Sequence, residues 1–323
     1  MMMAVIVLLM TAFLHSLPAW TRPDLFFGVR VDPGFRKTAE ARRIARGYRT
    51  VLWICMLLAV ALSVLVQRPE AALASLAGFY GAIALAHRRT LAHAVPADTA
   101  VEVNLGAPRE SLPGGPVAML VPLASLGVLA AWAMRNWNRL PERFPVHWGV
   151  HGADRWIART PRAVYGMIAQ DAVMSIVSVA MGVGIFYWSR RLTARPVAAE
   201  QSRFRRLNAQ IFFVLASLPA AIGWITVLQP PVAEAWMAGG VLLLAGFYYA
   251  LLIRNRPRFT ARASDSTPNS CWKMGIFYFN PADPAVFVMQ RFGIGYTLNF
   301  ASRWTWAGFA TLATVVSLRV VLR

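Results

Sequence analysis

The stretch that decides the fold runs from residue 163 to residue 188 and reads AVYGMIAQDAVMSIVSVAMGVGIFYW. Its only charged side chain is that of Asp171. An α-helix rises about 1.5 Å per residue and the hydrocarbon core of a bilayer is about 30 Å thick, so roughly 20 apolar residues suffice to cross it. This stretch therefore predicts a transmembrane helix.

Seven further apolar blocks follow the same pattern. They cover residues 1–20, 50–67, 70–86, 116–134, 209–228, 232–253 and 304–322. Hydrophobic residues make up 57% of the 323-residue chain and charged residues only 15%, whereas soluble domains have about a quarter charged residues. We expect an all-α polytopic membrane protein with about eight transmembrane helices, the first block being a helix rather than a signal peptide.

The charge of the chain is strongly basic, with 33 Lys plus Arg against 14 Asp plus Glu. Such basicity in a soluble protein would suggest nucleic acid, but the arginines here lie in loops between apolar blocks, so we expect no nucleic-acid partner. Cytoplasmic loops hold the excess of Lys and Arg. Alternate loops hold 24 of the 33 basic residues, which predicts that both termini lie outside the cytoplasm.

The long loops suggest three sequence segments. Residues 1–115 form a three-helix unit ending in a Pro- and Gly-rich linker, residues 116–253 form a four-helix unit, and residues 254–323 combine a cytoplasmic β-hairpin region with the last helix. The two cysteines, Cys55 and Cys271, lie in dissimilar surroundings, so we expect both to be free thiols rather than a disulfide pair.

The loop between the fourth and fifth blocks reads LPERFPVHWGVHGADRW over residues 140–156. Pro141 and Pro145 favour extended backbone at and before each proline. Gly149 and Gly152 permit left-handed turns. We expect one rigid, non-helical structure at the outer membrane surface.

This outer loop resembles that of a bacterial membrane-protein domain of unknown function, which also occurs in SdpI-type immunity and signalling proteins. The shared pattern is Leu-Pro, then Pro-x-His-aromatic, then Gly-x-x-Asp. The family usually has Asn where this chain has Gly149. The resemblance implies functional roles for Pro145, His147, Trp148, Gly152 and Asp154.

Two inner loops strengthen the resemblance. The stretch FFGVR at 26–30, followed by RKTAEARR at 36–43, resembles the Gly-x-Arg stretch and basic helix of these proteins. The loop that begins WKMGIFYFNP at 272–281 resembles a second small domain of unknown function often joined to the first. The resemblance implies a cytoplasmic motif made of Gly28, Arg30, Trp272, Gly275, Gly293 and Gly295.

The aromatic alternation in the last inner loop predicts a strand over 272–279 and a returning strand over 286–289. A two-stranded ribbon is marginal alone, so a partner is expected. Residues 27–30 have a pattern similar to that of residues 292–295. Two arrangements stay open: a small cytoplasmic sheet that joins both loops, or an aromatic hairpin lying on the lipid surface.

Two sites have alternative interpretations. His147, His151 and Asp154 could hold a metal, because imidazoles and a carboxylate suit zinc. Both histidines would lie on one face only in a helix, which is opposed by Gly149, Gly152 and Pro145. The alternative is that His147 and Asp154 form hydrogen bonds with the loop backbone or with each other. We therefore predict no cofactor. Asp171 is either a functional intramembrane group or a helix-end residue paired with a loop arginine.

No motif in the chain indicates a reaction, since neither a Gly-rich phosphate loop nor a Gly-x-Ser-x-Gly elbow occurs. The resemblance implies a non-enzymatic immunity or signal-relay component of the bacterial cytoplasmic membrane. Its partners would be the lipid bilayer and a toxin or regulatory protein, and the sequence gives no oligomeric state. The alternatives are a small-solute transporter, or a membrane metalloenzyme using His147, His151 and Asp154.

Overall fold

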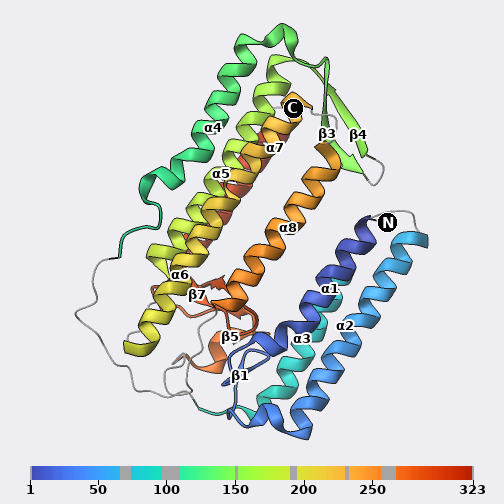
Figure 1. Cartoon of the computed structure of the whole chain (residues 1–323). Helices are drawn as coiled ribbons and strands as arrows, with labels where there is room; N and C mark the ends of the chain where they lie inside the picture. Colours follow the sequence, from blue (N-terminus) through green and yellow to red (C-terminus); the bar gives the residue numbers. More distant parts are fainter. Residues whose placement is uncertain are drawn as a thin grey trace. The chain divides into compact units, whose positions relative to one another are not determined.

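The structure is a computed structural model that describes residues 2–65, 74–96, 110–149, 152–189, 195–229, 233–255 and 267–321. It is mostly helical, and each expected apolar block contributes to a helix (Figure 1). The helices are α1 (Met2–Trp20), α2 (Ala39–Leu65), α3 (Ala74–Thr90), α4 (Gly115–Arg135), α5 (Pro161–Trp188), α6 (Arg195–Leu215), α7 (Ser217–Leu228), α8 (Ala233–Arg254) and α9 (Arg303–Val321).

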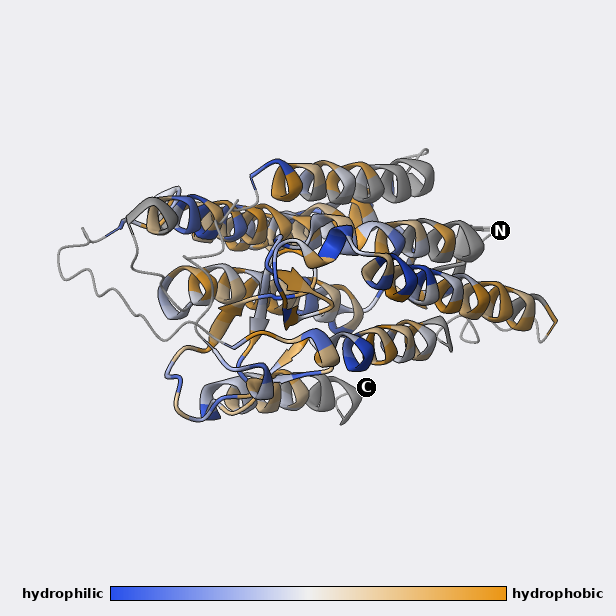
Figure 2. Ribbon diagram, turned by 90° about the horizontal axis from the view of Figure 1, so that it is seen from below, coloured by the Kyte–Doolittle hydropathy of each residue, from blue (hydrophilic) through white to orange (hydrophobic). Residues whose placement is uncertain are grey.

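Four helical stretches of the described residues are long and apolar enough to cross a membrane. They are Ala39–Leu62, Val117–Arg135, Pro161–Trp188 and Ala198–Leu228. Figure 2 shows hydrophobic residues along much of the helices and hydrophilic residues near helix ends and in loops. The chain is therefore a helical membrane protein. Length and composition support four spans among the described residues, and the count of eight spans stays a prediction.

The sixth apolar block is divided between α6 and α7 at Ala216. Pro219 has no N–H to donate to the carbonyl of Leu215, and a proline ring clashes with the carbonyl four residues earlier, so a regular helix is interrupted there. The hydroxyl of Ser175 on α5 donates to the carbonyl of Ala216 at 2.8 Å. A side chain of α5 thus bonds a carbonyl at the interruption, as membrane helices require.

The strands form four short antiparallel hairpins. They are β1 (Leu25–Phe26) with β2 (Val29–Arg30), β3 (Arg143–Gly149) with β4 (Gly152–Ala158), β5 (Trp272–Lys273) with β6 (Phe277–Tyr278), and β7 (Phe287–Met289) with β8 (Tyr296–Leu298). In the described residues, the strands of the two inner loops belong to separate two-stranded sheets. Of the two arrangements left open, the sheet that joins both loops is therefore wrong.

The continuous strand expected over 272–279 is also wrong. Met274 and Gly275 have φ values of 53° and 76°, which turn the chain because a strand needs negative φ. Residues 286–289 do not return along this segment as we expected. Phe287–Met289 pairs with Tyr296–Leu298 instead, in register from Phe287 opposite Leu298.

Contacts divide the chain into two compact units. Unit 1 comprises Met1–Leu105, Trp188–Gln201 and Arg256–Arg323, and unit 2 comprises Gly106–Tyr187 and Ser202–Asn255. The segment from residue 256 onward thus groups with the N-terminal helices. Two backbone contacts link this segment to Trp188–Gln201, since Val286 N–H donates to the carbonyl of Trp188 at 3.1 Å and Phe287 bridges Ser189.

The core of unit 1 lies where α1, α2 and α3 meet the inner loops. α2 packs against both α1 and α3, and these helices lie side by side in Figure 1. The apolar face of α2 recurs at helical spacing and includes Ile44, Tyr48 and Leu52. Phe27, Ile276 and Phe292 from the two inner loops join the same buried cluster.

Unit 2 has two apolar clusters along α5. One contains Val164 and Ile168 and packs with residues of α4, α7 and the β3 hairpin. The other contains Phe186 and packs with Ala209 and Phe213 of α6. The helix α5 therefore connects the hairpin end of this unit to its opposite end.

Candidate functional site

Two tight turns of unit 1 carry the expected cytoplasmic motif. Phe27 and Gly28 join β1 to β2 with φ values of 44° and 76°, and two positive φ values are the signature of a type I′ hairpin turn. Met274 and Gly275 occupy the equivalent left-handed positions after β5. In each turn, a bulky apolar residue in a left-handed conformation precedes a glycine.

The two turns meet at their glycines. A Cβ built at Gly28 would clash with the Cα and the carbonyl of Gly275, and a Cβ at Gly275 would lie within 2.8 Å of the Nδ1 atom of His87. Any larger residue would force the turns apart. Gly28 and Gly275 are thus needed both for positive φ and for close backbone approach, and we call this contact, with the residues around it, the turn cluster.

Arg291 is the polar centre of the turn cluster and is 1% exposed. Its Nη1 atom donates to Asn269 Oδ1 at 2.8 Å and to the carbonyl of Gly28 at 3.4 Å. Its Nη2 atom donates to the carbonyl of Thr267 at 2.5 Å and to that residue's hydroxyl at 3.1 Å. The guanidinium also lies 5.0 Å from the ring centroid of Trp272, within cation–π range. One side chain thereby connects three segments of the cluster.

Aromatic packing joins the turn cluster to the helices. The ring of Phe27 stacks on that of Phe292 at 5.2 Å and meets the edge of Tyr48 at 5.0 Å. The hydroxyl of Tyr48 donates to the carbonyl of Leu14 at 2.9 Å. The turn of the first inner loop is therefore tied to α1, α2 and the C-terminal loop at once.

His87 supports the turn of the first inner loop from the end of α3. Its Nδ1 atom lies 2.9 Å from the carbonyl of Phe27, so the neutral tautomer with the proton on Nδ1 donates to that carbonyl. His87 lies one residue beyond the apolar block. Burial lowers the pKa of this imidazole, the bond to Phe27 opposes the shift, and the charge of Arg291 lowers the pKa further.

Arg30 is 5% exposed and belongs to the same cluster. Its backbone N–H donates to Asn269 Oδ1 at 3.2 Å, so Asn269 receives hydrogen bonds from both Arg30 and Arg291. Among the described residues, the buried Nε and Nη2 atoms of Arg30 have no hydrogen-bond partner. The side-chain amide oxygen of Asn269 thus accepts from the backbone of one buried arginine and from the guanidinium of another.

The remaining glycines of the motif lie in the β7–β8 turn. Gly293 and Gly295 have φ values of 97° and 117°, which L side chains rarely adopt. The carbonyl of Gly295 accepts from the backbone N–H of Gln290 at 3.0 Å and closes this turn. All six motif residues, Gly28, Arg30, Trp272, Gly275, Gly293 and Gly295, therefore lie in unit 1, in segments that contact one another.

The outer loop of unit 2 is the β3–β4 hairpin, and its base is firmly held. Phe144 is 0% exposed and packs beside Val164 and Leu140. Arg159 Nη1 donates to the carbonyls of Trp137 at 3.0 Å and Leu140 at 2.7 Å. The non-helical structure expected from the prolines is confirmed, and it takes the form of a hairpin.

The expected functional residues of the outer loop lie along this hairpin. Pro145 is buried at its base, His147 is opposite Arg155 in the register, and Gly152 is opposite Gly149. The side chains of His147, Trp148 and Asp154, and the whole of His151, lie outside the described residues. The proposed metal site and the proposed hydrogen-bond network both stay predictions.

Asp171 lies well inside α5, ten residues after its first residue, Pro161. Its carboxylate faces α7, because a Cβ built at Gly223 would lie 2.9 Å from Asp171 Oδ2. Leu126 and Leu129 of α4 border the same space. The absence of a side chain at Gly223 therefore makes room for this carboxylate between helices.

Comparison with known protein families gives a match over a short segment of the chain. Residues 281–306 match a family of unknown function (DUF5808). The matched segment contains Arg291, Gly293 and Gly295, and so it includes the β7–β8 part of the turn cluster. No curated protein and no solved structure matches this chain.

Sequence reasoning missed Arg291 and His87. Sequence analysis gives Arg291 no role beyond that of the other loop arginines, and it assigns no role to His87. The signal that could have found Arg291 is its position directly before Phe292-Gly293-Ile294-Gly295, a run already marked as similar to residues 27–30. The free thiols expected at Cys55 and Cys271 are confirmed.

Proposed function

We propose that this protein is an SdpI-like component of the bacterial cytoplasmic membrane that acts without catalysis in immunity or signal relay. In this proposal, all eight apolar blocks cross the membrane and both termini lie outside the cytoplasm. The inner loops then act from the cytoplasmic side, and the β3–β4 hairpin lies on the outer side. A toxin or a regulatory protein is the proposed partner.

The turn cluster is the observation that carries the proposal. The motif residues that the resemblance implies lie far apart in the sequence, yet their segments contact one another in unit 1. Gly28 and Gly275 meet directly, and Arg291 reaches Gly28 from the segment that matches the family of unknown function. The cluster is formed by loops that pack closely on one another. Because loops held by a rigid scaffold often carry binding functions, this packing supports a role in recognition or relay.

The construction of unit 2 supports a relay across the membrane. At one end, the hairpin base packs on α5 through Phe144 and Val164. At the other end, Phe186 of α5 lies 5.6 Å beneath the guanidinium of Arg205, which pairs with Glu110 at 2.6 Å. Because α5 runs without interruption over 28 residues, or about 42 Å, a displacement at the hairpin would be transmitted along it.

A bacterial strain that has lost its own SdpI-type protein provides the test. Survival under the corresponding toxin measures immunity, and a toxin-responsive reporter gene measures relay. We expect this chain to restore at least one of them, and Gly28→Ala to abolish the effect at equal membrane abundance. Gly81→Ala is the matched control, since Gly81 is exposed on α3 and a Cβ there meets nothing within 4 Å. A wild-type chain that changes neither readout would refute the proposal.

Small-solute transport is the second candidate, and the surroundings of Asp171 favour it. The helix interruption at Ala216 and the carboxylate against Gly223 both lie between α5 and its neighbours, and transporters place interrupted helices and polar groups at such depths. Uptake of amino acids, sugars and inorganic ions into vesicles containing the protein tests this candidate. Uptake abolished by Asp171→Asn would favour transport over relay.

A further inference from the structure

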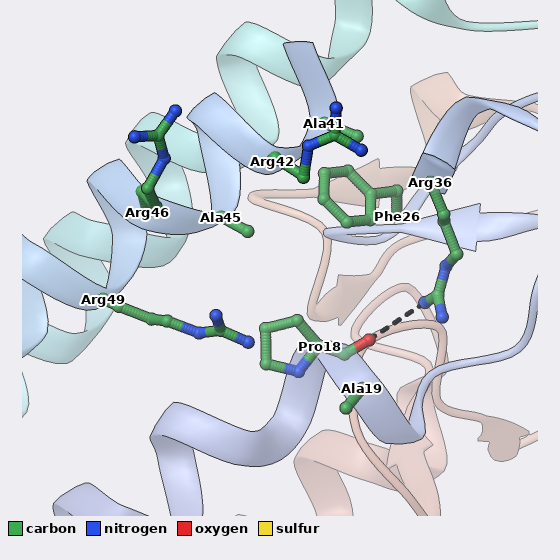
Figure 3. A pocket seen from close by; sticks show the side chains of 9 residues that line it. All are labelled: Pro18, Ala19, Phe26, Arg36, Ala41, Arg42, Ala45, Arg46 and Arg49. Carbon is green, nitrogen blue, oxygen red and sulfur yellow. Dashed lines mark hydrogen bonds between the residues drawn. The ribbon is translucent and has the colours of Figure 1, made fainter. Parts of the chain in front are cut away.

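A basic groove lies on unit 1 between the end of α1 and the first half of α2. Its volume is about 430 Å³, and its lining includes Pro18 of α1, Phe26 of β1 and four arginines. The arginines are Arg36, Arg42, Arg46 and Arg49. Among the described residues that line the groove there is no acidic side chain. Figure 3 shows Arg49 extending from α2 toward Pro18.

Three of the four cations come from one face of α2. Residues 42, 46 and 49 follow the spacing of four and three that places side chains on the same side of a helix. Like charges at this spacing repel one another and destabilise a helix. The exposed side chains of Arg42 and Arg46, with the half-buried Arg49, therefore form an arrangement that a bound anion would stabilise.

The walls of the groove hold part of this charge in place. Arg36 Nη2 donates to the carbonyls of Pro18 at 3.0 Å and Leu25 at 2.9 Å. Arg42 Nη1 donates to the carbonyl of Lys37 at 2.7 Å. The Nε atom of Arg49 is buried and has no hydrogen-bond partner within the described residues. The guanidinium groups of Arg36 and Arg42 are thus held at the rim of the groove by hydrogen bonds. The guanidinium of Arg49 keeps one N–H donor that makes no hydrogen bond within the described residues.

We propose that this groove binds a phosphate-bearing anion. Guanidinium groups present paired N–H donors that match phosphate oxygens, and several arginines without acids select an anion with more than one acceptor oxygen. The apolar block of α2 begins at residue 50, one residue after Arg49, so the groove lies where that helix enters the membrane. The phosphate can come from the headgroup of an anionic phospholipid or from a soluble phosphate compound.

Orientation of the helices by positive charge is the competing explanation. That rule depends on the number of basic residues in a loop and not on their direction. Arg43 is exposed on α2 and lies in the same inner segment between the first two apolar blocks, but it does not line the groove. Removal of Arg43 therefore changes the charge of the loop by the same amount and leaves the groove intact.

Calorimetric titration of the purified full-length protein in zwitterionic detergent tests the proposal. The probes are dioctanoyl phosphatidylglycerol, dioctanoyl phosphatidylcholine and inorganic pyrophosphate. We expect saturable binding of phosphatidylglycerol, pyrophosphate or both, and none of phosphatidylcholine. Arg46→Gln and Arg49→Gln should each weaken binding about fivefold, while Arg43→Gln should leave it unchanged within about twofold.

The pattern of results identifies the source of the phosphate. Preference for phosphatidylglycerol over pyrophosphate assigns a lipid headgroup, and the reverse preference assigns a soluble compound. If the glutamine variants fail to accumulate, the double variant Arg46→Lys and Arg49→Lys keeps the charge and should still weaken binding severalfold, because an ammonium has no paired fork. Saturable binding of neither anion would overturn the proposal, as would an Arg43→Gln effect equal to that of Arg46→Gln.

Discussion

A buried guanidinium is costly unless its donors find acceptors, and at Arg291 the acceptors are supplied by two segments of the chain that lie far apart in the sequence. Thr267 and Asn269 precede β5, whereas the carbonyl of Gly28 belongs to the first inner loop. Trp272 adds a ring face at 5.0 Å. The arginine therefore positions the turns relative to one another as well as filling space between them.

The first prediction is that Arg291→Gln destabilises the protein by about 3 kcal/mol, because several hydrogen bonds to a charged donor are lost and buried carbonyls are left unpaired. Thermal unfolding in detergent, followed by circular dichroism, measures the change. Arg303→Gln is the control, since the exposed Arg303 lies 5.3 Å from the ring of the exposed Trp304. Equal destabilisation by both substitutions would contradict the role assigned to Arg291.

The second prediction concerns His87, whose pKa is lowered below about 6.5 chiefly by burial. Between its lowered folded pKa and 6.5, the unfolded state binds more protons than the folded state, so stability falls as the pH falls through this window. His87→Asn keeps a donor for the carbonyl of Phe27 and cannot titrate, so we expect it to flatten this part of the pH profile. A profile unchanged by the substitution would assign the pH dependence to another group.

Some residues of the turn cluster could be predicted from the sequence, and others could not. The glycines of the turn cluster were expected from the family resemblance, which includes them in the cytoplasmic motif. Phe27 and Met274 gave no such signal, since bulky residues rarely adopt positive φ. By residue type alone, a buried arginine such as Arg291 is also indistinguishable from an arginine that faces water.

At the scale of elements, the outer hairpin depends on contacts at its base. Arg159 bonds two carbonyls and lies 5.9 Å from the ring centroid of Trp137. Gln229, directly after α7, donates its side-chain amide to the carbonyl of Arg143 at 2.7 Å. The hairpin is therefore attached to the ends of α4, α5 and α7.

The third prediction is that Arg159→Gln loosens the hairpin base, at a cost of about 1 to 3 kcal/mol for the carbonyls left without a charged donor. Trypsin added from the outer side should then cleave after Arg143 or Arg155 faster than in the wild type. Arg162→Gln is the control, because Arg162 is exposed three residues later on α5. Cleavage that stays at the wild-type rate in Arg159→Gln would show that the base is held by other contacts.

The elements were easier to predict than their pairing. Long apolar blocks fold as helices in a membrane because their backbone groups must be bonded internally, and prolines at 141 and 145 oppose helix in the outer loop. The pairing of the inner strands stayed open between a shared sheet and a separate hairpin, because alternation gives the face of a strand but not its partner. The turn at Met274 and Gly275 separates β5 from β6, so the two inner loops meet through turns rather than through a common sheet.

At the scale of the whole molecule, the fourth prediction concerns the sides of the membrane. In a background with Cys55→Ala and Cys271→Ser, single cysteines at Gly149 and Ala282 should react with an impermeant maleimide from opposite sides. Gly149 should react in intact cells, and Ala282 only after permeabilisation. Reaction of both cysteines in intact cells would refute the eight-span arrangement that the charge distribution predicts.

The grouping of the chain ends was beyond sequence reasoning. The sequence predicted a separate C-terminal segment over 254–323, and its long connection gave no indication of its partner. In unit 1, residues 256–323 group with the first three helices, because Phe292 and Ile276 complete the apolar cluster around Tyr48. Apolar surface that neither segment can bury alone brings them together.

The most direct test of this account is a double-mutant cycle on Gly28 and Gly275 in the full-length protein. Each Gly→Ala change should separate the two turns, so the second change has no contact left to break. We predict that the double variant is destabilised by at least about 1 kcal/mol less than the sum of the two single variants, as for residues in direct contact. Strictly additive losses of unfolding free energy would show that the turns do not touch.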